Sequence, residues 1–220
     1  MEDPYDRFPA GFFSRADESN DQLFYDPLRL VTHIDDRAIR AVGTLYEHLQ
    51  IGAPKRKDLG GRVLDLMSSW VSHFIQPPTH LTVLGMNERE LAANPDAVQR
   101  VVHDLNANPV LPFDDHSFDD AVCCVSIDYL ATPIEVMREL QRVLQPGGRF
   151  VCTFSNRCFP TKAIRGWLSL NDDQRCQLVA EYFALAGGFE PAEMALCTAP
   201  GSHGDPLYAV WAATQADRDR

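Results

Sequence analysis

Five short apolar runs, separated by longer polar or amphipathic segments, most strongly constrain how this chain can fold. They are RVLDLM, HLTVLG, QRVVHDL, DDAVCCVS and GRFVCTFS. Runs of this length, with few polar residues on either face, are typical of parallel strands buried on both sides. Parallel neighbours cannot be joined by a tight turn, so we expect helices in the connections between them. The pattern predicts an open, mostly parallel, doubly wound α/β sheet with helices on both faces.

Helical periodicity appears on both sides of these strands. Apolar residues recur every three or four positions over residues 36–50, which predicts an amphipathic helix. Another helix is expected to begin at Thr132, where Pro133 suits the first turn and Glu135 would complete a capping box. The sequence Pro146-Gly147-Gly148 is expected to end it.

The last third of the chain predicts two more helices and a hairpin. The helices are expected over residues 161–168 and 171–186. The runs EMALCTA and PLYAVWAAT follow, and the stretch around PGSHGD between them is too short for a crossover helix. It suits an antiparallel hairpin, which brings the expected sheet to about seven strands.

Chain length and local pattern predict one compact domain with an N-terminal addition. The 220 residues suit a single α/β domain. We expect a main domain over residues 56–220 and a helical cap or lid, with its helix, over residues 1–55. The stretch FYDPLRLVTHID contains Pro27 and is at best a broken helix, and GAPKRKDLGG is a polar loop.

Charge and cysteine content narrow the partners and the compartment. The net charge of −11, from 20 basic and 31 acidic residues, repels nucleic acid and anionic membranes. No apolar window is long enough for a transmembrane helix, and the start MEDPYDRF does not resemble a signal peptide. The six cysteines form no C-x-x-C pair and no zinc-ligand spacing. We therefore expect no metal site and a cytoplasmic protein with reduced cysteines.

Ligands of such sheets bind beyond the carboxyl ends of the strands, near the point where strand order reverses. In this sequence that narrows the search to residues 65–73, 85–90, 104–108 and 126–130, together with Asn156 and Arg157.

These segments carry a resemblance to a known family. The runs VLDLMSSWVSH, TVLGMNEREL, HDLNANPVLPFDDHSFDDAV and RVLQPGGRFV look like a class I S-adenosylmethionine-dependent methyltransferase. The resemblance covers residues 62–154 and implies a Rossmann-like sheet. It also implies S-adenosylmethionine as cofactor, S-adenosylhomocysteine as product and a small-molecule acceptor, with the protein a monomer or homodimer.

The resemblance assigns cofactor-binding roles residue by residue. Asp65 would order the cofactor loop, and Met67, Ser68 and Ser69 would run beneath the methionine part. Asn87, with its neighbour Glu88, matches the ribose-binding position. Asp104 would accept from the adenine amino group and Leu105 would pack on the adenine ring, while Ser126 would face the sulfonium.

The loop after the first strand departs from the family. Glycines are usual there because backbone must approach the ligand closely, yet the aligned positions are Met67, Ser69 and Val71. Either the loop binds cofactor in a modified way, with the Ser68 and Ser69 hydroxyls replacing backbone contacts, or the chain is an inactive methyltransferase-like binding protein. A nucleotide-dependent oxidoreductase is a weaker alternative, because no G-x-G-x-x-G follows the first strand.

Candidates for acceptor binding and catalysis come from three segments. Methyl transfer is an in-line displacement, so positioning matters most, and a base is needed only where the acceptor must lose a proton. The candidates follow the fourth strand, follow the fifth strand or lie in the N-terminal segment: Asp128 and Tyr129; Asn156 and Arg157; Tyr25, Arg29 and His33. The sequence does not identify the acceptor, and an oxygen, nitrogen or sulfur nucleophile stays open.

Overall fold

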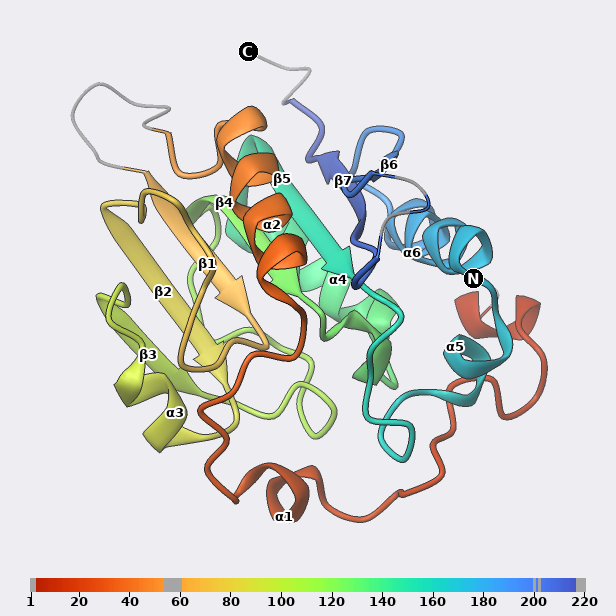
Figure 1. The fold of residues 1–220 in the computed structure, drawn as a ribbon. Helices are drawn as coiled ribbons and strands as arrows, with labels where there is room; N and C mark the ends of the chain where they lie inside the picture. The colour runs from red at the N-terminus through yellow and green to blue at the C-terminus, as the bar shows by residue number, and fades with distance from the viewer. Residues whose placement is uncertain (1–2, 54–60, 200, 202, 217–220) are drawn as a thin grey trace.

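A mixed sheet forms the centre of the molecule. The computed structural model describes residues 3–53, 61–199, 201 and 203–216, and within them the sheet has seven strands in the order β3-β2-β1-β4-β5-β7-β6 (Figure 1). The strands are β1 Arg62–Leu66, β2 His80–Gly85, β3 Gln99–Val102, β4 Phe118–Cys124, β5 Leu144–Phe154, β6 Glu193–Leu196 and β7 Tyr208–Ala213. β1 to β5 are parallel, and β7 runs antiparallel to both β5 and β6. The predicted parallel sheet with its closing hairpin is confirmed.

Six α-helices surround the described sheet. They are α1 Asp21–Tyr25, α2 Asp36–His48, α3 Glu88–Ala93, α4 Pro133–Val143, α5 Arg165–Ser169 and α6 Asp172–Ala186, with short 3₁₀ turns η1 Pro4–Arg7 and η2 Ile127–Tyr129. The helices expected over 36–50 and 171–186 are confirmed to within two residues. The helix expected over 161–168 begins later, at Arg165. Most of the expected loop over residues 52–61, and part of the turn at PGSHGD, lie outside the described residues.

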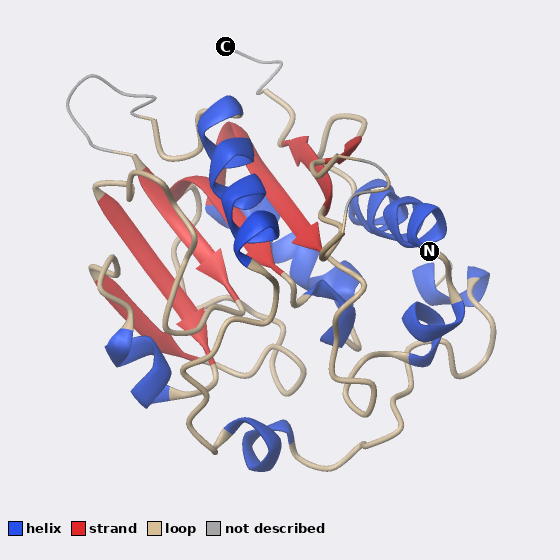
Figure 2. Cartoon of the chain, in the orientation of Figure 1, coloured by secondary structure: helices blue, strands red, loops and turns tan. Residues whose placement is uncertain are grey.

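Alternating strand residues divide the core into two layers. Leu64 and Leu66 of β1 pack into the cluster that contains the buried faces of α4 and α6. Val63, which points the other way, packs into the cluster that contains α2. Figure 2 shows α2 in front of the sheet and α4 behind it. Helices therefore cover both faces, as the apolar runs predict.

The connection between β1 and β2 contains no helix, contrary to expectation. Residues 67–79 form an irregular loop that packs directly on α2. A Cβ added to Gly43 of α2 would lie 2.7 Å from the Ile75 side chain and 3.0 Å from the His73 carbonyl. Phe74 packs on Tyr46 of α2, with ring centroids 4.8 Å apart. The loop thus fills the space that a crossover helix would occupy. The described residues 103–117, which join β3 to β4, contain no α-helix either.

The start of α4 corrects the predicted capping box. Thr132 is the cap residue, but its hydroxyl makes no capping bond and is buried without a hydrogen-bond partner. Tyr5 takes over this role from the N-terminal segment: its hydroxyl donates to the Glu135 carboxylate and accepts from the Ile134 backbone N–H. Glu135 is therefore paired with a residue 130 positions away, which no local pattern could indicate.

The N-terminal segment passes along the carboxyl ends of the strands (Figure 1). Arg15 forms an isolated antiparallel bridge with Ile164, and the Arg165 and Gly166 backbone N–H groups donate to Ser14 and Phe12 carbonyls at 2.8 Å. The segment is thereby joined by backbone hydrogen bonds to the region after β5. Among the helices described, none combines the length and apolar character needed to cross a membrane.

Candidate functional site

A cavity of about 520 Å³ lies at the carboxyl ends of the strands. Its walls come from the N-terminal segment and from the residues that follow β1, β2, β3, β4 and β5. The order of strands reverses between β1 and β4, and the residues that follow these two strands lie next to each other in the cavity wall. The cavity therefore sits at the position and has the size expected for a small-molecule site in an α/β sheet.

Most residues singled out from the sequence line this cavity. They are Tyr25, His33, Met67, Ser68, Ser69, Asn87, Asp104, Leu105, Ser126, Tyr129, Asn156 and Arg157. Asp65, Glu88, Asp128 and Arg29 do not. Glu88 is exposed on the first turn of α3 and Asp65 is buried behind the loop after β1. The structure thus corrects the expected placement of Glu88 and Asp128 against a ligand.

Met67 keeps a glycine-like backbone in the loop after β1. Its φ is +55°, in the left-handed region that L-residues with a Cβ seldom adopt. The next residue, Ser68, donates its hydroxyl to Asp65 Oδ2 at 2.7 Å, and its backbone N–H donates to the Leu84 carbonyl at 2.8 Å. Asp65 thus fixes the loop from behind. Burial raises the pKa of Asp65 to about 7, although hydrogen bonds from Ser72 and Ser68 oppose that shift.

The close approach that a loop glycine usually permits occurs at the end of β2 instead. A Cβ added to Gly85 would lie 2.2 Å from the Ser68 carbonyl oxygen. Only glycine allows the loop to cross β2 at this distance. The sequence retains the glycine on the strand beneath the loop rather than in the loop itself.

A second strained residue faces Met67 from the end of β4. Val125 has φ +48°, an uncommon conformation for a β-branched residue, and it lines the cavity. The Ser126 hydroxyl donates to the Cys124 carbonyl at 3.1 Å and lies 3.5 Å from the Met67 carbonyl. Strained backbone is often concentrated where a ligand must be held. Here both strained residues flank the reversal point of the sheet.

Asn87 is occupied by structural hydrogen bonds. Its side-chain oxygen caps α3 by accepting from the Arg89 and Glu90 backbone N–H groups, at 3.0 and 3.2 Å. Its amide nitrogen donates to the carbonyls of Tyr25 and Asp26, at 2.8 and 3.0 Å. Asn87 therefore joins α3 to the N-terminal segment.

Glu90 is a cavity carboxylate that the sequence analysis did not single out. It accepts from the Ser69 hydroxyl and from the Arg29 backbone N–H, each at 2.7 Å. The Ser69 hydroxyl thus donates to protein rather than pointing its proton into the cavity. No motif marked Glu90, although its position three residues after the capping Asn87 suits a residue of the first helical turn.

Asp104 and Leu105 form the wall that follows β3. Asp104 accepts from the Asn106 and Ala107 backbone N–H groups at 2.9 and 3.1 Å, both through Oδ1. Leu105 is buried beside it. The Asn106 side chain continues this wall by donating to Asp21 Oδ2 at 2.8 Å.

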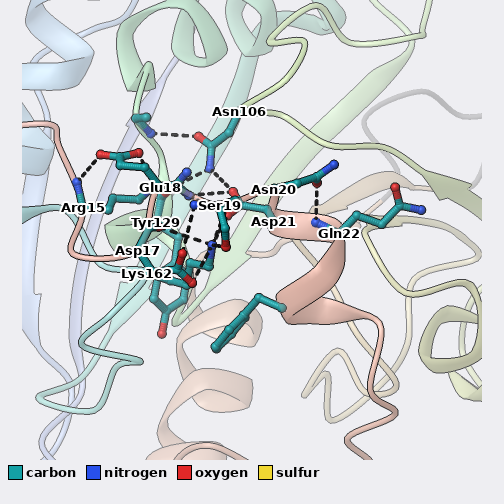
Figure 3. A network of polar contacts seen from close by, with 12 residues as sticks. Arg15, Asp17, Glu18, Ser19, Asn20, Asp21, Gln22, Asn106, Tyr129 and Lys162 are labelled. Atoms are coloured by element: carbon teal, nitrogen blue, oxygen red, sulfur yellow. Dashed lines mark hydrogen bonds and ion pairs between the residues drawn. The ribbon is translucent and has the colours of Figure 1, made fainter.

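A buried ion cluster holds the N-terminal wall in place (Figure 3). Asp21 accepts from Arg15 at 2.6 and 2.8 Å, and lies 2.9 Å from the Lys162 ammonium. Lys162, which is fully buried, also contacts the Asp17 carboxylate at 3.1 Å and donates to the Ser19 carbonyl at 2.9 Å. No local pattern indicates this cluster, because Lys162 is distant along the chain from Arg15, Asp17 and Asp21.

Asp128 lies outside the cavity, in the core. It is 3% exposed, and its Oδ2 has no hydrogen-bond partner. Burial raises the pKa of Asp128 to about 8, so the carboxyl group is protonated at neutral pH. Direct contact with a substrate is therefore not the role that its geometry supports. Its neighbour Tyr129 does line the cavity, and the Tyr129 hydroxyl accepts from the Phe159 backbone N–H at 2.8 Å.

Two other candidates differ in what surrounds them. Partial burial lowers the pKa of His33; the Glu90 charge opposes that shift and the Arg29 charge adds to it. Arg157 donates to Asp205 at 2.8 Å and is largely exposed. No group of three or more potential metal ligands occurs in the part of the chain that is described.

Comparison with known proteins finds a matching family model and a curated relative. Residues 63–152 match the model of a family described as "Methyltransferase domain". The chain is 29% identical to methyltransferase GfsG of Streptomyces halstedii over 171 residues, which cover 68% of this chain and 58% of GfsG. The chain thus spans less than two thirds of that relative.

Solved structures share the fold. The [4+2]-cyclase SpnF has a TM-score of 0.54 at 16% identity, over 90% of this chain and 91% of its own. An S-adenosylmethionine-dependent methyltransferase from Mesorhizobium loti has a TM-score of 0.50 at 18% identity, over 76% of this chain and 96% of its own. At these identities the likeness shows the fold alone, and one of the two neighbours is named as a cyclase.

Proposed function

We propose that this chain, whose residues 63–152 match a methyltransferase domain, is a class I S-adenosylmethionine-dependent methyltransferase that methylates a small organic acceptor held in the cavity. The cofactor supplies an electrophilic methyl group on a sulfonium. The protein then has to bind, orient and desolvate the acceptor and, where the acceptor is protonated, take up a proton.

The residues that line the cavity fit this cofactor. Asp104 is a carboxylate acceptor for the adenine amino group, and Leu105 is an apolar surface for the ring. Asn87, whose oxygen already caps α3, has Glu90 beside it as the carboxylate for the ribose hydroxyls. We assign the amino-acid end to the loop at Met67–Ser69, with Ser126 on the sulfonium side. Asp65 supports that loop from behind.

One observation favours an active methyltransferase over an inactive methyltransferase-like binding protein. Met67 retains the left-handed backbone that a glycine would have, and Gly85 provides the close approach that the loop needs. A strained conformation has a cost of about 1–2 kcal/mol and persists only when its surroundings impose it. One of the three positions that glycine usually holds therefore keeps a glycine-like backbone although the glycine is absent. This supports a site rebuilt for binding.

The acceptor side of the cavity is the N-terminal segment together with the residues after β4 and β5. Of the catalytic candidates, we retain His33, Tyr25, Tyr129 and Arg157, which line the cavity. His33 is the one suited to accept a proton, because it is an imidazole that lines the acceptor side of the cavity. We assign Asp128 a structural role.

Titration calorimetry with S-adenosylhomocysteine tests this proposal. We expect the parent protein to bind it and to gain thermal stability, because a ligand that binds only the native state stabilises it. Asp104→Ala should lose roughly 1.5–3 kcal/mol of affinity, the usual value of a hydrogen bond to a charged group. Glu88→Ala, which removes an exposed carboxylate outside the cavity, is the matched control and should bind like the parent. Absence of binding heat at millimolar ligand would favour the inactive binding protein.

A further inference from the structure

The side chains on the acceptor side of the cavity indicate which chemical class of acceptor would bind there. Its aromatic and imidazole rings belong to Tyr25, His33, Tyr129 and Phe159. Phe159 is the centre of this group: its ring centroid lies 5.2 Å from His33 and 6.0 Å from Tyr129. Phe24, which does not line the cavity, also packs on Phe159, with ring centroids 5.2 Å apart. We call the ring-lined part of the cavity the aromatic slot.

The aromatic slot is preformed, because the segment that carries Tyr25 and His33 is anchored. Asp21, four residues before Tyr25, is bonded to Arg15, Lys162 and Asn106 within the buried ion cluster (Figure 3). Moving this segment would also break the hydrogen bonds from the Asn87 amide to the Tyr25 and Asp26 carbonyls and from the Arg29 backbone N–H to Glu90. The slot is therefore a fixed wall, in contrast to a lid that closes after binding.

Charged groups on this side already make contacts within the protein. Arg157 is the only arginine or lysine among the described residues that line the cavity, and it binds Asp205. The one lining carboxylate of the N-terminal wall, Asp21, is neutralised by Arg15 and Lys162. Arg29 lies over the Phe24 ring, outside the lining, and donates to the Phe24 and Pro27 carbonyls. Arg29 also lies 5.8 Å from the Phe159 ring centroid, and Glu90, whose charge acts on His33, accepts from the Ser69 hydroxyl and the Arg29 backbone N–H. A charged acceptor would therefore have to compete with the contacts that these two groups already make.

We propose that the aromatic slot selects a flat, uncharged aromatic acceptor with an ionisable hydroxyl, and that His33 accepts the hydroxyl proton. This proposal rests on the proposed function. Aromatic walls favour a planar ring by stacking and edge contacts. The proton moves from the acceptor oxygen to an imidazole nitrogen of His33, while the oxygen lone pair forms the new bond to the methyl carbon. The carbon–sulfur bond breaks, and its electron pair stays on sulfur as the neutral thioether.

Three ligands that share one ring system test the charge preference. Naphthol is uncharged at neutral pH, naphthoate is an anion and naphthylmethylamine is a cation. Each is titrated calorimetrically into protein saturated with S-adenosylhomocysteine. We expect naphthol to bind at least tenfold more tightly than either charged analogue. Equal affinities, tighter binding of a charged analogue, or no binding of naphthol to the loaded protein would overturn the proposal. Failure of S-adenosylhomocysteine itself to bind would instead overturn the proposed function.

Two variants separate the ring from the proton acceptor. Phe159→Leu keeps an apolar side chain. It should lower the affinity for naphthol at least fivefold without changing the affinity for S-adenosylhomocysteine. Phe113→Leu is the control, because Phe113 packs on Phe118 away from the cavity. His33→Phe keeps a ring against Phe159 but removes the proton acceptor. It should lower the rate of methyl transfer to naphthol at least tenfold, while the affinity of the protein loaded with S-adenosylhomocysteine for naphthol stays within twofold of the parent. An unchanged rate in this variant would exclude His33 as the proton acceptor.

Discussion

At the scale of single residues, the left-handed conformation of Met67 predicts an inverted preference between alanine and glycine. Both Met67→Ala and Met67→Gly lose the same packing, but only alanine keeps a Cβ in a strained backbone at φ +55°. We expect the glycine variant to be the more stable of the two by about 1 kcal/mol, measured by denaturant unfolding.

Val71 provides the control for that comparison, since it is aligned with another of the expected glycines but does not have positive φ. There the usual order should hold, with alanine more stable than glycine by roughly 0.5–1 kcal/mol. If Met67→Ala were as stable as Met67→Gly, or more stable, Met67 would not hold a glycine-like backbone. A site rebuilt for binding would then have no support from this loop.

Asp128 predicts a pH dependence of stability with a definite sign. Its folded pKa is raised to about 8 by burial, whereas an unfolded aspartate titrates near 4. Between these values the folded protein holds a proton that the unfolded chain has released, so this group lowers the unfolding free energy as pH rises from about 4 to 8. Asp128→Asn has no such proton. The unfolding free energy of the variant minus that of the parent should therefore increase over this range, by more than about 1.4 kcal/mol, the equivalent of one pKa unit. A pH-independent difference would mean that Asp128 is solvated or ionised in the folded state.

At the scale of elements, β1, β2, β4 and β5 were predictable because each is an apolar run that is mostly buried, whereas the edge strands β3 and β6 are mostly exposed. The connections between the strands were less predictable from the sequence. The β1–β2 connection lacks the expected helix because Gly43 and Tyr46 of α2 receive the loop directly, through Ile75 and Phe74. That packing depends on two segments about thirty residues apart. The start of α4 is similar: Thr132 and Glu135 have the spacing of a capping box, yet Tyr5 competes successfully for Glu135.

The candidate site divides in the same way. Motif position led to Ser126, Asp104 and Leu105, which follow strands and line the cavity. Glu90 and Asp21 could not be found by pattern, because their importance comes from partners that are far away in sequence. Their residue types alone, carboxylates on an acidic chain, are too common to be informative.

At the scale of the whole molecule, the N-terminal segment and the proposed cofactor wall are linked by a short chain of bonds. Lys162 contacts Asp21, Asp21 accepts from the Asn106 side chain, and the Asn106 backbone N–H donates to Asp104. Glu90 makes a second link, from Ser69 to the Arg29 backbone. The local stability of the segment and cofactor binding should therefore be coupled.

Lys162→Met should reveal that coupling. Loss of the ammonium leaves part of the Asp21 and Asp17 charge uncompensated, which should raise hydrogen exchange of backbone amides over residues 12–25 while the strands β1, β4 and β5 stay protected. Affinity for S-adenosylhomocysteine should fall, and saturating ligand should restore the lost protection. Coupling is reciprocal, so the factor by which opening weakens the ligand must equal the factor by which the ligand suppresses opening. Arg7→Ala, which removes an exposed ion pair with Glu181, should change neither quantity. If Lys162→Met loosened the segment and left the affinity of the parent intact, the segment would be a structural attachment with no part in the binding site.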